Sequence, residues 1–273
     1  MARVGKDIFA YAGADIPVSL MVMANHRGIT ADCEAPGASH LFATATEISD
    51  ARLSFAFPAQ DTPWIPSIAA GRHIPMAGLG HFSMSRAALD AATDRTTAVD
   101  LGTLDVQRAV AKIRVLDDIE DETNMRITSV RILGAATRGA FMPSISLCPE
   151  WGSGTCQVES PSARAEWFDA SIAASTLQGT HSTDGKEYTS FTAYLPEYSY
   201  SSGSGPVLEV TTECAADGGA HTYTCRLSEA GITDIVRNHI YELYVNVRAN
   251  TGLEVQYTVC EWVTMPDVNI DFN

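Results

Sequence analysis

The feature that most limits the fold of this chain is a long alternation of side-chain character near its C-terminus. Residues 235–262 read IVRNHIYELYVNVRANTGLEVQYTVCEW. Every second residue falls on the same side, and one side is mostly apolar: His239, Tyr241, Leu243, Val245 and Val247, resuming with Val255, Tyr257 and Val259. A period of two residues indicates β-strands, and the ANTG break between the two runs indicates a turn. The stretch therefore predicts a β-hairpin.

Similar runs recur along the chain, separated by Gly, Pro, Asn and Asp. They predict strands at residues 16–25, 104–116, 125–135, 186–196 and 205–214. The first of these, IPVSLMVMAN, is apolar on both faces, which is typical of a central strand. Helical periodicity is scarce, and its best window, SRAALDAATD at 85–94, predicts only a short helix. Strands spaced by about 8–12 residues, with turn signals between them, predict an all-β chain built from β-sandwiches.

The length of the chain allows two domains or one large sandwich. Its 273 residues suffice for two units of ordinary size, and 45% hydrophobic residues suffice for a buried core. We place the boundary near GAFMPSIS at residues 139–146, where a strand pair ends and a cysteine loop begins. The predicted domains are residues 1–142 and residues 143–273, and the second ends in a terminal strand at 263–273.

The net charge of −15, from 18 basic and 33 acidic residues, argues against nucleic acid as a partner. Phosphate contacts need clustered Lys and Arg. No stretch is long and apolar enough to predict a membrane-spanning helix. Residues 1–15 lack the charged and apolar regions of a signal peptide. We therefore expect either a cytosolic protein or one whose export segment has been removed.

The cysteines favour export. Cys148 and Cys156 bracket PEWGSGT, and Cys214 and Cys225 bracket AADGGAHTYT. Each pair lies at the ends of a loop that contains glycine, so we predict two local disulfides and an oxidising compartment. Buried free thiols are the alternative. A zinc site is not expected, because no CxxC pair occurs.

Catalytic motifs are absent from the sequence. It contains no G-x-S-x-G, no H-E-x-x-H and no phosphate-binding G-x-x-x-x-G-K. The seven histidines share no spacing, and His239 is interpreted as a hydrogen-bonding group at the start of a strand. The acidic run at 117–122 lacks the ligand order of a calcium loop, so a solvated turn is predicted and a calcium site is the alternative. We expect no enzyme, no metal and no cofactor.

Aromatic residues supply one candidate for ligand contact. Trp151 lies inside the loop between Cys148 and Cys156. A tethered tryptophan can stack on a sugar ring, and a tryptophan folded back onto its own domain is the alternative. A cluster of tyrosines is predicted to be half-buried at strand ends, with a contact patch as the alternative: Tyr194, Tyr198 and Tyr200.

Several short segments occur in one order along most of the chain. They are IPVSLMVMAN (16–25), GRHIPMAGLG (71–80), LDVQRAVAKIRV (104–115), AYLPEY (193–198), VRNHIYELYVNV (236–247) and YTVCEW (257–262). Together they resemble segments of the fimbrillins, the type V pilins and related surface proteins of Bacteroidales-type bacteria.

The resemblance implies two tandem β-sandwich domains of transthyretin-like, Greek-key topology. It also implies export as a lipoprotein, attachment to the outer membrane through a lipid on the precursor, and assembly into a cell-surface fimbrium with other fimbrial subunits. In this family an Arg-specific protease removes an N-terminal segment, and a strand from a neighbouring subunit fills the groove that is left. The present chain departs from the pattern, because it lacks the lipoprotein cysteine and leader and has six cysteines.

The last segment, VTMPDVNIDFN, again alternates, with Val268, Ile270 and Phe272 on one side. Such a peptide can supply ladder hydrogen bonds and apolar side chains to an open sheet edge, and pairing within its own domain is the alternative. The first functional hypothesis is a structural fimbrial subunit that assembles by donor-strand exchange. The second is a tip or surface adhesin that binds glycan or a host or bacterial protein through loops such as 148–156. A secreted hydrolase is a third, for which the sequence offers no suitable spacing of catalytic residues.

Overall fold

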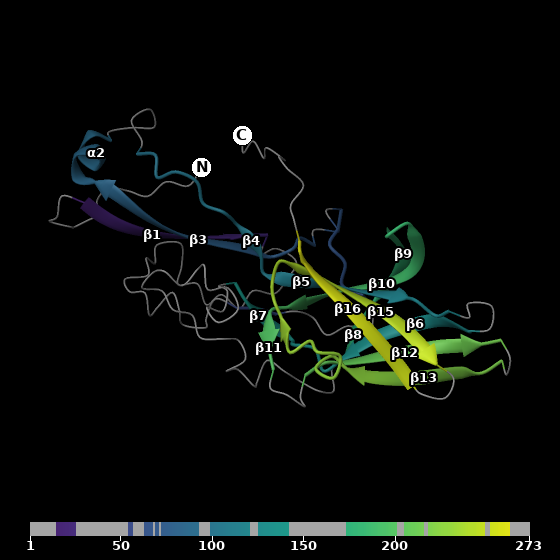
Figure 1. Ribbon diagram of the computed structural model, residues 1–273. Coiled ribbons are helices and arrows are strands. Elements are labelled where there is room, and N and C mark those ends of the chain that lie inside the picture. The colour runs from purple at the N-terminus through teal and green to yellow at the C-terminus, as the bar shows by residue number, and fades with distance from the viewer. Residues whose placement is uncertain are drawn as a thin grey trace.

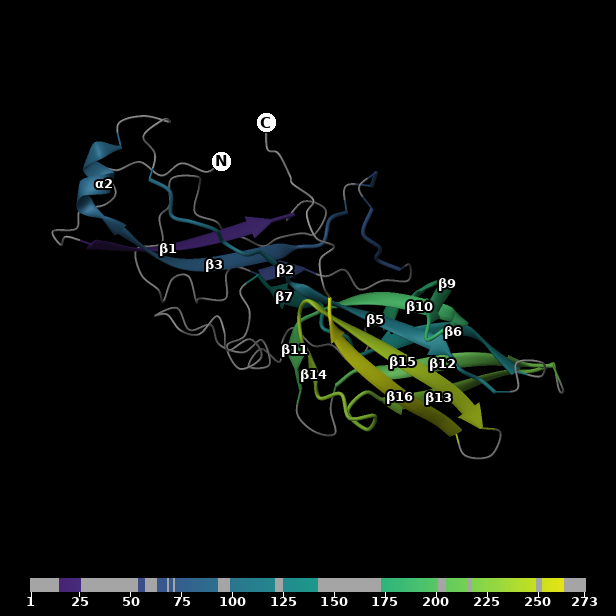
Figure 2. The same cartoon turned by 45° about the horizontal axis from the view of Figure 1, so that its top comes forward.

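The computed structural model places the chain in β-sheets, as the alternation predicts (Figures 1 and 2). The structure describes residues 15–25, 54–56, 63–67, 69–70, 72–92, 99–120, 125–141, 173–200, 205–215, 218–248 and 252–262. Among them the one helix is α2 (Arg86–Ala91). The predicted all-β class is therefore confirmed. No helix in the described ranges is long and apolar enough to cross a bilayer.

Two sheets pack face to face as a β-sandwich. The larger has the order β16 (Gly252–Glu261), β15 (His239–Arg248), β5 (Val110–Asp117), β10 (Lys186–Pro196) and β9 (Leu177–Thr183). The smaller has the order β13 (Ala220–Arg226), β12 (Val207–Cys214), β6 (Met125–Leu133) and β8 (Ala173–Ser175). Buried side chains from both sheets form one core between them, among them Ile113, Ile132, Leu208 and Leu243.

The predicted hairpin is formed by β15 and β16. Its antiparallel register runs without a break from the pair His239 and Glu261 to the pair Arg248 and Gly252. Tyr241, Leu243 and Val245 are buried in the core, as their shared side of the alternation predicts. β15 also runs parallel to β5, so the hairpin is attached to the middle of the larger sheet.

A second sheet system holds the N-terminal part of the chain. Its order is β1 (Asp15–Ala24), β3 (Met76–Ser85) and β4 (Gln107–Arg108). β1 pairs with β3 along its whole length, and no described residue pairs with its other edge. The prediction of a central strand is therefore wrong for the described part of the chain, where β1 ends its sheet.

The short helix predicted in this region is confirmed. α2 follows β3 directly, and its first turn is capped by the Ser85 hydroxyl, which accepts a hydrogen bond from the Ala88 amide at 3.1 Å. Leu89 of α2 is buried and belongs to a small apolar cluster with Ile16 and Met84. The helix thus covers one end of the β1–β3 pair.

Two short strand pairs complete the described structure. β2 (Ser54–Ala56) pairs with β7 (Arg138–Ala140), and β11 (Tyr198–Ser199) pairs with β14 (Asp234–Ile235). In Figure 2, β2 and β7 lie where the N-terminal sheet meets the sandwich, and β11 and β14 lie beside the adjoining end of the sandwich.

The predicted domain boundary at residues 142 and 143 does not separate the sheets. β5 and β6 precede it, yet they pair with β10, β15 and β12, which follow it. The sandwich therefore takes strands from both sides of the boundary, and the change from the N-terminal sheet to the sandwich falls between β4 and β5. The end of a strand pair and the start of a cysteine loop near residues 139–146 do not mark the domain boundary, because strands that pair with each other lie far apart in the sequence.

Candidate functional site

Residues from four of the quoted segments meet where the N-terminal sheet joins the sandwich. We call this region the junction and define it by Arg108, Glu197, Arg237, Asn238 and Trp262. Arg108 ends β4, Glu197 follows β10, Arg237 and Asn238 precede β15, and Trp262 follows β16. The segments that carry the family resemblance therefore share a location, although they are scattered along the sequence.

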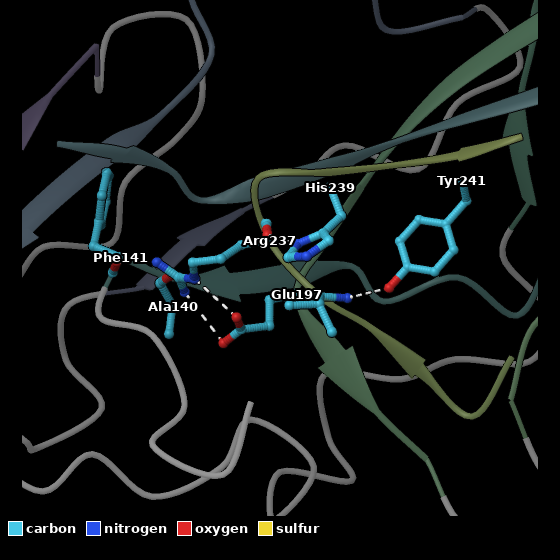
Figure 3. A network of polar contacts seen from close by, with 7 residues as sticks. Ala140, Phe141, Glu197, Arg237, His239 and Tyr241 are labelled. Carbon is cyan, nitrogen blue, oxygen red and sulfur yellow. Dashed lines mark hydrogen bonds and ion pairs between the residues drawn. The ribbon is translucent and has the colours of Figure 1, made fainter. Parts of the chain in front are cut away.

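A buried ion pair lies at the centre of the junction (Figure 3). The Arg237 guanidinium donates to the two carboxylate oxygens of Glu197 at 2.9 and 3.3 Å. It also donates to the backbone carbonyl oxygens of Phe141 at 2.6 Å and Ala140 at 2.9 Å. Neither charged side chain is exposed to solvent. Because the guanidinium bonds to both Glu197 and the backbone around residue 140, this one residue fixes the end of β7 against the end of β10 and the segment between β14 and β15.

The backbone around Arg237 is fixed by its neighbours in the same segment. His239 Nδ1 lies 2.7 Å from the Arg237 carbonyl oxygen, an acceptor, so this nitrogen is the protonated one. The Tyr241 hydroxyl accepts from the Val236 amide at 2.8 Å and donates to the Asp234 carbonyl at 3.0 Å. The interpretation of His239 as a hydrogen-bonding group at a strand start is confirmed. These contacts hold the turn before β15 in one conformation.

A second cation, Arg108, ties the end of β4 to the end of β16. Its guanidinium donates to Asn238 Oδ1 and to the Trp262 carbonyl, both at 2.9 Å, and lies 4.4 Å from the centre of the Trp262 ring. Asn238 has a φ of 56°, in the left-handed region that Asn tolerates better than most residues. Its backbone bonds to both Val110 and Trp262. Burial lowers the pKa of Arg108, which remains a cation at neutral pH.

Aromatic rings cover the outer end of the junction. Tyr194 packs against Trp64 and Trp262 at centroid distances of 5.6 and 5.8 Å. These rings cover Val110 and Phe141, which are fully buried. Tyr194 is half-buried as predicted, whereas Tyr198 and Tyr200 are buried and stacked on each other. The junction is thus a small core with its own apolar residues.

Small residues let the N-terminal sheet approach this region. The Ala109 amide donates to the Pro75 carbonyl at 2.8 Å. A side chain at Gly78 would collide with the Asp105 carbonyl and with the Leu104 side chain. The small residues after Pro75 in GRHIPMAGLG are therefore required by close backbone packing.

The charged groups of the junction make internal contacts that hold its segments together. The described residues contain no group of three or more His, Cys, Asp or Glu placed to hold a metal ion. In the acidic run, the Asp117 carboxylate accepts from two backbone amides and Asp118 pairs with Lys186 at 2.7 Å. Those two carboxylates therefore act within the fold, as turn residues do.

Most predicted site residues lie outside the described part of the chain. These are Val268, Ile270 and Phe272 of the tail, Cys148 and Cys156, and Trp151. The tail as a donor strand, the disulfide of the 148–156 loop and the adhesin role of Trp151 therefore stay predictions.

The predicted disulfide between Cys214 and Cys225 is not formed, and both thiols are free. The reason is the register of the hairpin that contains them. Cys225 faces Leu208 across β12 and β13, whereas Cys214 lies at the turn end, six residues along the strand from Leu208. At about 3.4 Å per residue the two positions are roughly 20 Å apart along the strand, far beyond disulfide reach.

Two of the strands that end their sheets in the described structure are long. β1 and β16 are ten residues long and end their sheets, and each pairs on one side only with described residues. Tyr257 and Val259 of β16 are 38% and 44% exposed, and Met23 of β1 is 36% exposed. An open edge with exposed apolar side chains can accept a further strand.

Known structures similar to this one include fimbrial and cell adhesion proteins of Bacteroidales. The tip fimbrial protein Mfa3 of Porphyromonas gingivalis, with a C-terminal truncation, is 14% identical over 70% of this chain and 65% of that one, with a TM-score of 0.42. A fimbrial assembly protein of Parabacteroides distasonis is 11% identical over 92% and 74%, with a TM-score of 0.42. A proposed cell adhesion protein of Bacteroides uniformis is 12% identical over 79% and 68%, with a TM-score of 0.41. No family model and no curated protein matches the chain.

Proposed function

We propose that this protein is a structural subunit of a cell-surface fimbrium, joined to neighbouring subunits by strand exchange. The observation that carries the proposal is the open edge of β1. Its sequence, DIPVSLMVMA, is apolar on both faces like a central strand, yet its described partner lies on one side only. A strand from a second subunit on the other side would give β1 the environment that its sequence predicts.

The tail at 263–273 is the strand that we assign to this edge. Val268, Ile270 and Phe272 alternate with polar residues, so one face of the added strand is apolar. Burial of each apolar side chain contributes roughly 1.5–3 kcal/mol as an upper bound. The ladder hydrogen bonds fix the register, and the ordering of the tail offsets part of the gain. The sum is sufficient for a durable joint between subunits.

The same proposal covers the location and partners of the protein. Other fimbrial subunits are its partners, and a lipid on the precursor is its connection to the outer membrane. The rigid junction fits this role, because a subunit that transmits force along a polymer needs its two parts held in a fixed relation.

Deletion of the tail tests the proposal. A chain that lacks residues 263–273 is expected to stay folded and monomeric, whereas the full chain forms polymers that persist in SDS without heating. A synthetic peptide of residues 263–273, added to the truncated chain, is expected to raise its melting temperature. Unchanged polymer ladders after the deletion would show that the tail is not the joint.

Two point variants make the test specific to one face of the tail. Ile270→Asp places a charge on the apolar face and is expected to abolish polymers. Asn269→Asp adds the same charge to the polar face and is expected to leave polymers intact. Equal behaviour of the two variants would contradict an alternating donor strand.

A further inference from the structure

The face of the larger sheet that points away from the core has an open middle. On this face of β5, Val110 and Leu116 are fully buried, whereas Lys112 between them is half-buried in the described structure. The aromatic rings of the junction cover the Val110 end. Since β5 is paired with β10 and with β15, the open middle is a surface of side chains with no free backbone edge.

The nearest carboxylate on this surface is already used. Glu242 of β15 forms an ion pair with Arg114 and lies 3.1 Å from His181 Nε2. The side chains of Arg114 and Glu242 are only 13% and 14% exposed, so this pair is largely shielded from water. Glu242 therefore has little capacity left to neutralise a further cation.

Lys112 is that further cation. It forms no hydrogen bond or ion pair with any residue that the structure describes. Burial lowers the pKa of Lys112, and the neighbouring Arg114 lowers it further, while Glu242 raises it. A partly desolvated ammonium without its own counter-ion is costly, and an anionic ligand would remove that cost.

The groups around Lys112 have a mixed character. Its cross-strand neighbours are Tyr194 on β10 and Ile240 on β15. The Tyr194 ring is held in place by two tryptophans, so it forms a fixed wall. Thr192 lies beside Arg114 in the next row, and no described residue hydrogen-bonds to the Thr192 or Tyr194 hydroxyls. The surface thus offers one cation, an aromatic ring and two hydroxyls.

We propose that Lys112, Thr192 and Tyr194 form a binding site for an acidic sugar, of the hexuronic acid class. Lys112 pairs with the sugar carboxylate, the ring of the sugar lies against Tyr194, and the two hydroxyls bond to sugar hydroxyls. An acidic peptide fits this surface less well, because extended peptides bind through backbone ladders and β5 has none free. The site goes beyond the fimbrial role and does not depend on it.

Binding to the folded full-length chain tests the site directly. Calorimetric titrations with methyl glucuronide and with methyl glucoside compare two sugars that differ in the carboxylate. We expect the glucuronide to bind, more weakly at high salt, and the glucoside to show no measurable binding. A glutamate-rich peptide forms the third arm. Binding of the peptide without the glucuronide would overturn the assignment to sugars, and silence from all three would overturn the site.

Matched lysine variants locate the binding. Lys112→Met keeps an unbranched side chain of nearly the same length and removes the charge, and it is expected to weaken glucuronide binding by roughly tenfold or more. Lys186→Met is the control, because Lys186 lies on the same sheet but is paired with Asp118. Circular dichroism establishes that both variants are folded. Equal affinity of Lys112→Met and the unaltered chain would refute the proposal.

Discussion

Replacement of Arg237 by methionine is expected to destabilise the sandwich strongly. The substitution removes four hydrogen bonds, two to Glu197 and one each to the carbonyls of Phe141 and Ala140. It also leaves the Glu197 carboxylate buried without its counter-charge. Loss of one partner of a buried pair costs about 3–5 kcal/mol. A domain is stable by only about 5–15 kcal/mol, so much of the total is lost.

Urea unfolding followed by tryptophan fluorescence measures the effect. The double variant Arg237→Met with Glu197→Leu removes both charges, so it is expected to lose less stability than the single variant. The double variant is still expected to be less stable than the unaltered chain. The carbonyls of Phe141 and Ala140 lose the hydrogen bonds from Arg237, and each buried carbonyl that loses its donor costs about 1–3 kcal/mol of stability.

A surface pair supplies the control. Arg131 and Glu209 lie 3.4 Å apart, with side chains 47% and 22% exposed. Arg131→Met is therefore expected to cost less than about 1 kcal/mol. The reasoning would be refuted if Arg237→Met cost no more than Arg131→Met, or if the double variant were less stable than the single one.

Three further predictions concern pH, packing and thiols. Burial raises the pKa of Tyr241 to about 12, so the contribution of Tyr241 to stability should be constant below about pH 10, the ordinary tyrosine pKa, and stability should fall between about pH 10 and 12. Melting curves at stepped pH measure this, and a flat profile over that range would contradict it. Gly78→Ala should lower the melting temperature, because the added Cβ would collide with the backbone of Asp105. Gly179→Ala should change the melting temperature little, because the added Cβ has room there. Equal shifts in melting temperature for the two variants would contradict the packing argument. Peptide mapping without reduction should find no disulfide between Cys214 and Cys225, since their positions do not face each other.

The sequence predicts local structure well where the pattern is long. The alternation from residue 239 onward identified both strands of the hairpin and the buried side of β15, because a period of two leaves little choice of face. The short helix followed from the helical periodicity of SRAALDAATD. These features depend on neighbours in sequence, which a single chain displays.

Features that depend on distant residues were predicted poorly. The segments around Glu197 and Arg237 were both recognised, but their ion pair was not, because it forms only when topology brings residues 40 positions apart together. The disulfide of Cys214 and Cys225 was wrong for a similar reason, since loop length was considered and strand register was not. The domain boundary was misplaced because β5 and β6 pair with strands much later in the chain.

The proposed site for an acidic sugar was not predicted from the sequence either. The sequence predicts a strand at residues 104–116, and nothing local indicates that Glu242 pairs with Arg114 and that no described residue pairs with Lys112. The sequence does contain a signal, namely two cations, Lys112 and Arg114, that alternate with apolar residues between Val110 and Leu116. Its meaning required the arrangement of the whole sheet.

Photo-cross-linking of assembled material tests the central claim most directly. Benzoylphenylalanine is placed at position 270, and chains labelled with ¹⁴N and ¹⁵N are mixed before assembly. The account predicts cross-links from position 270 to residues 15–24 that join chains of different isotope label. Cross-links confined to one chain, or directed to another surface while polymers still form, would contradict it.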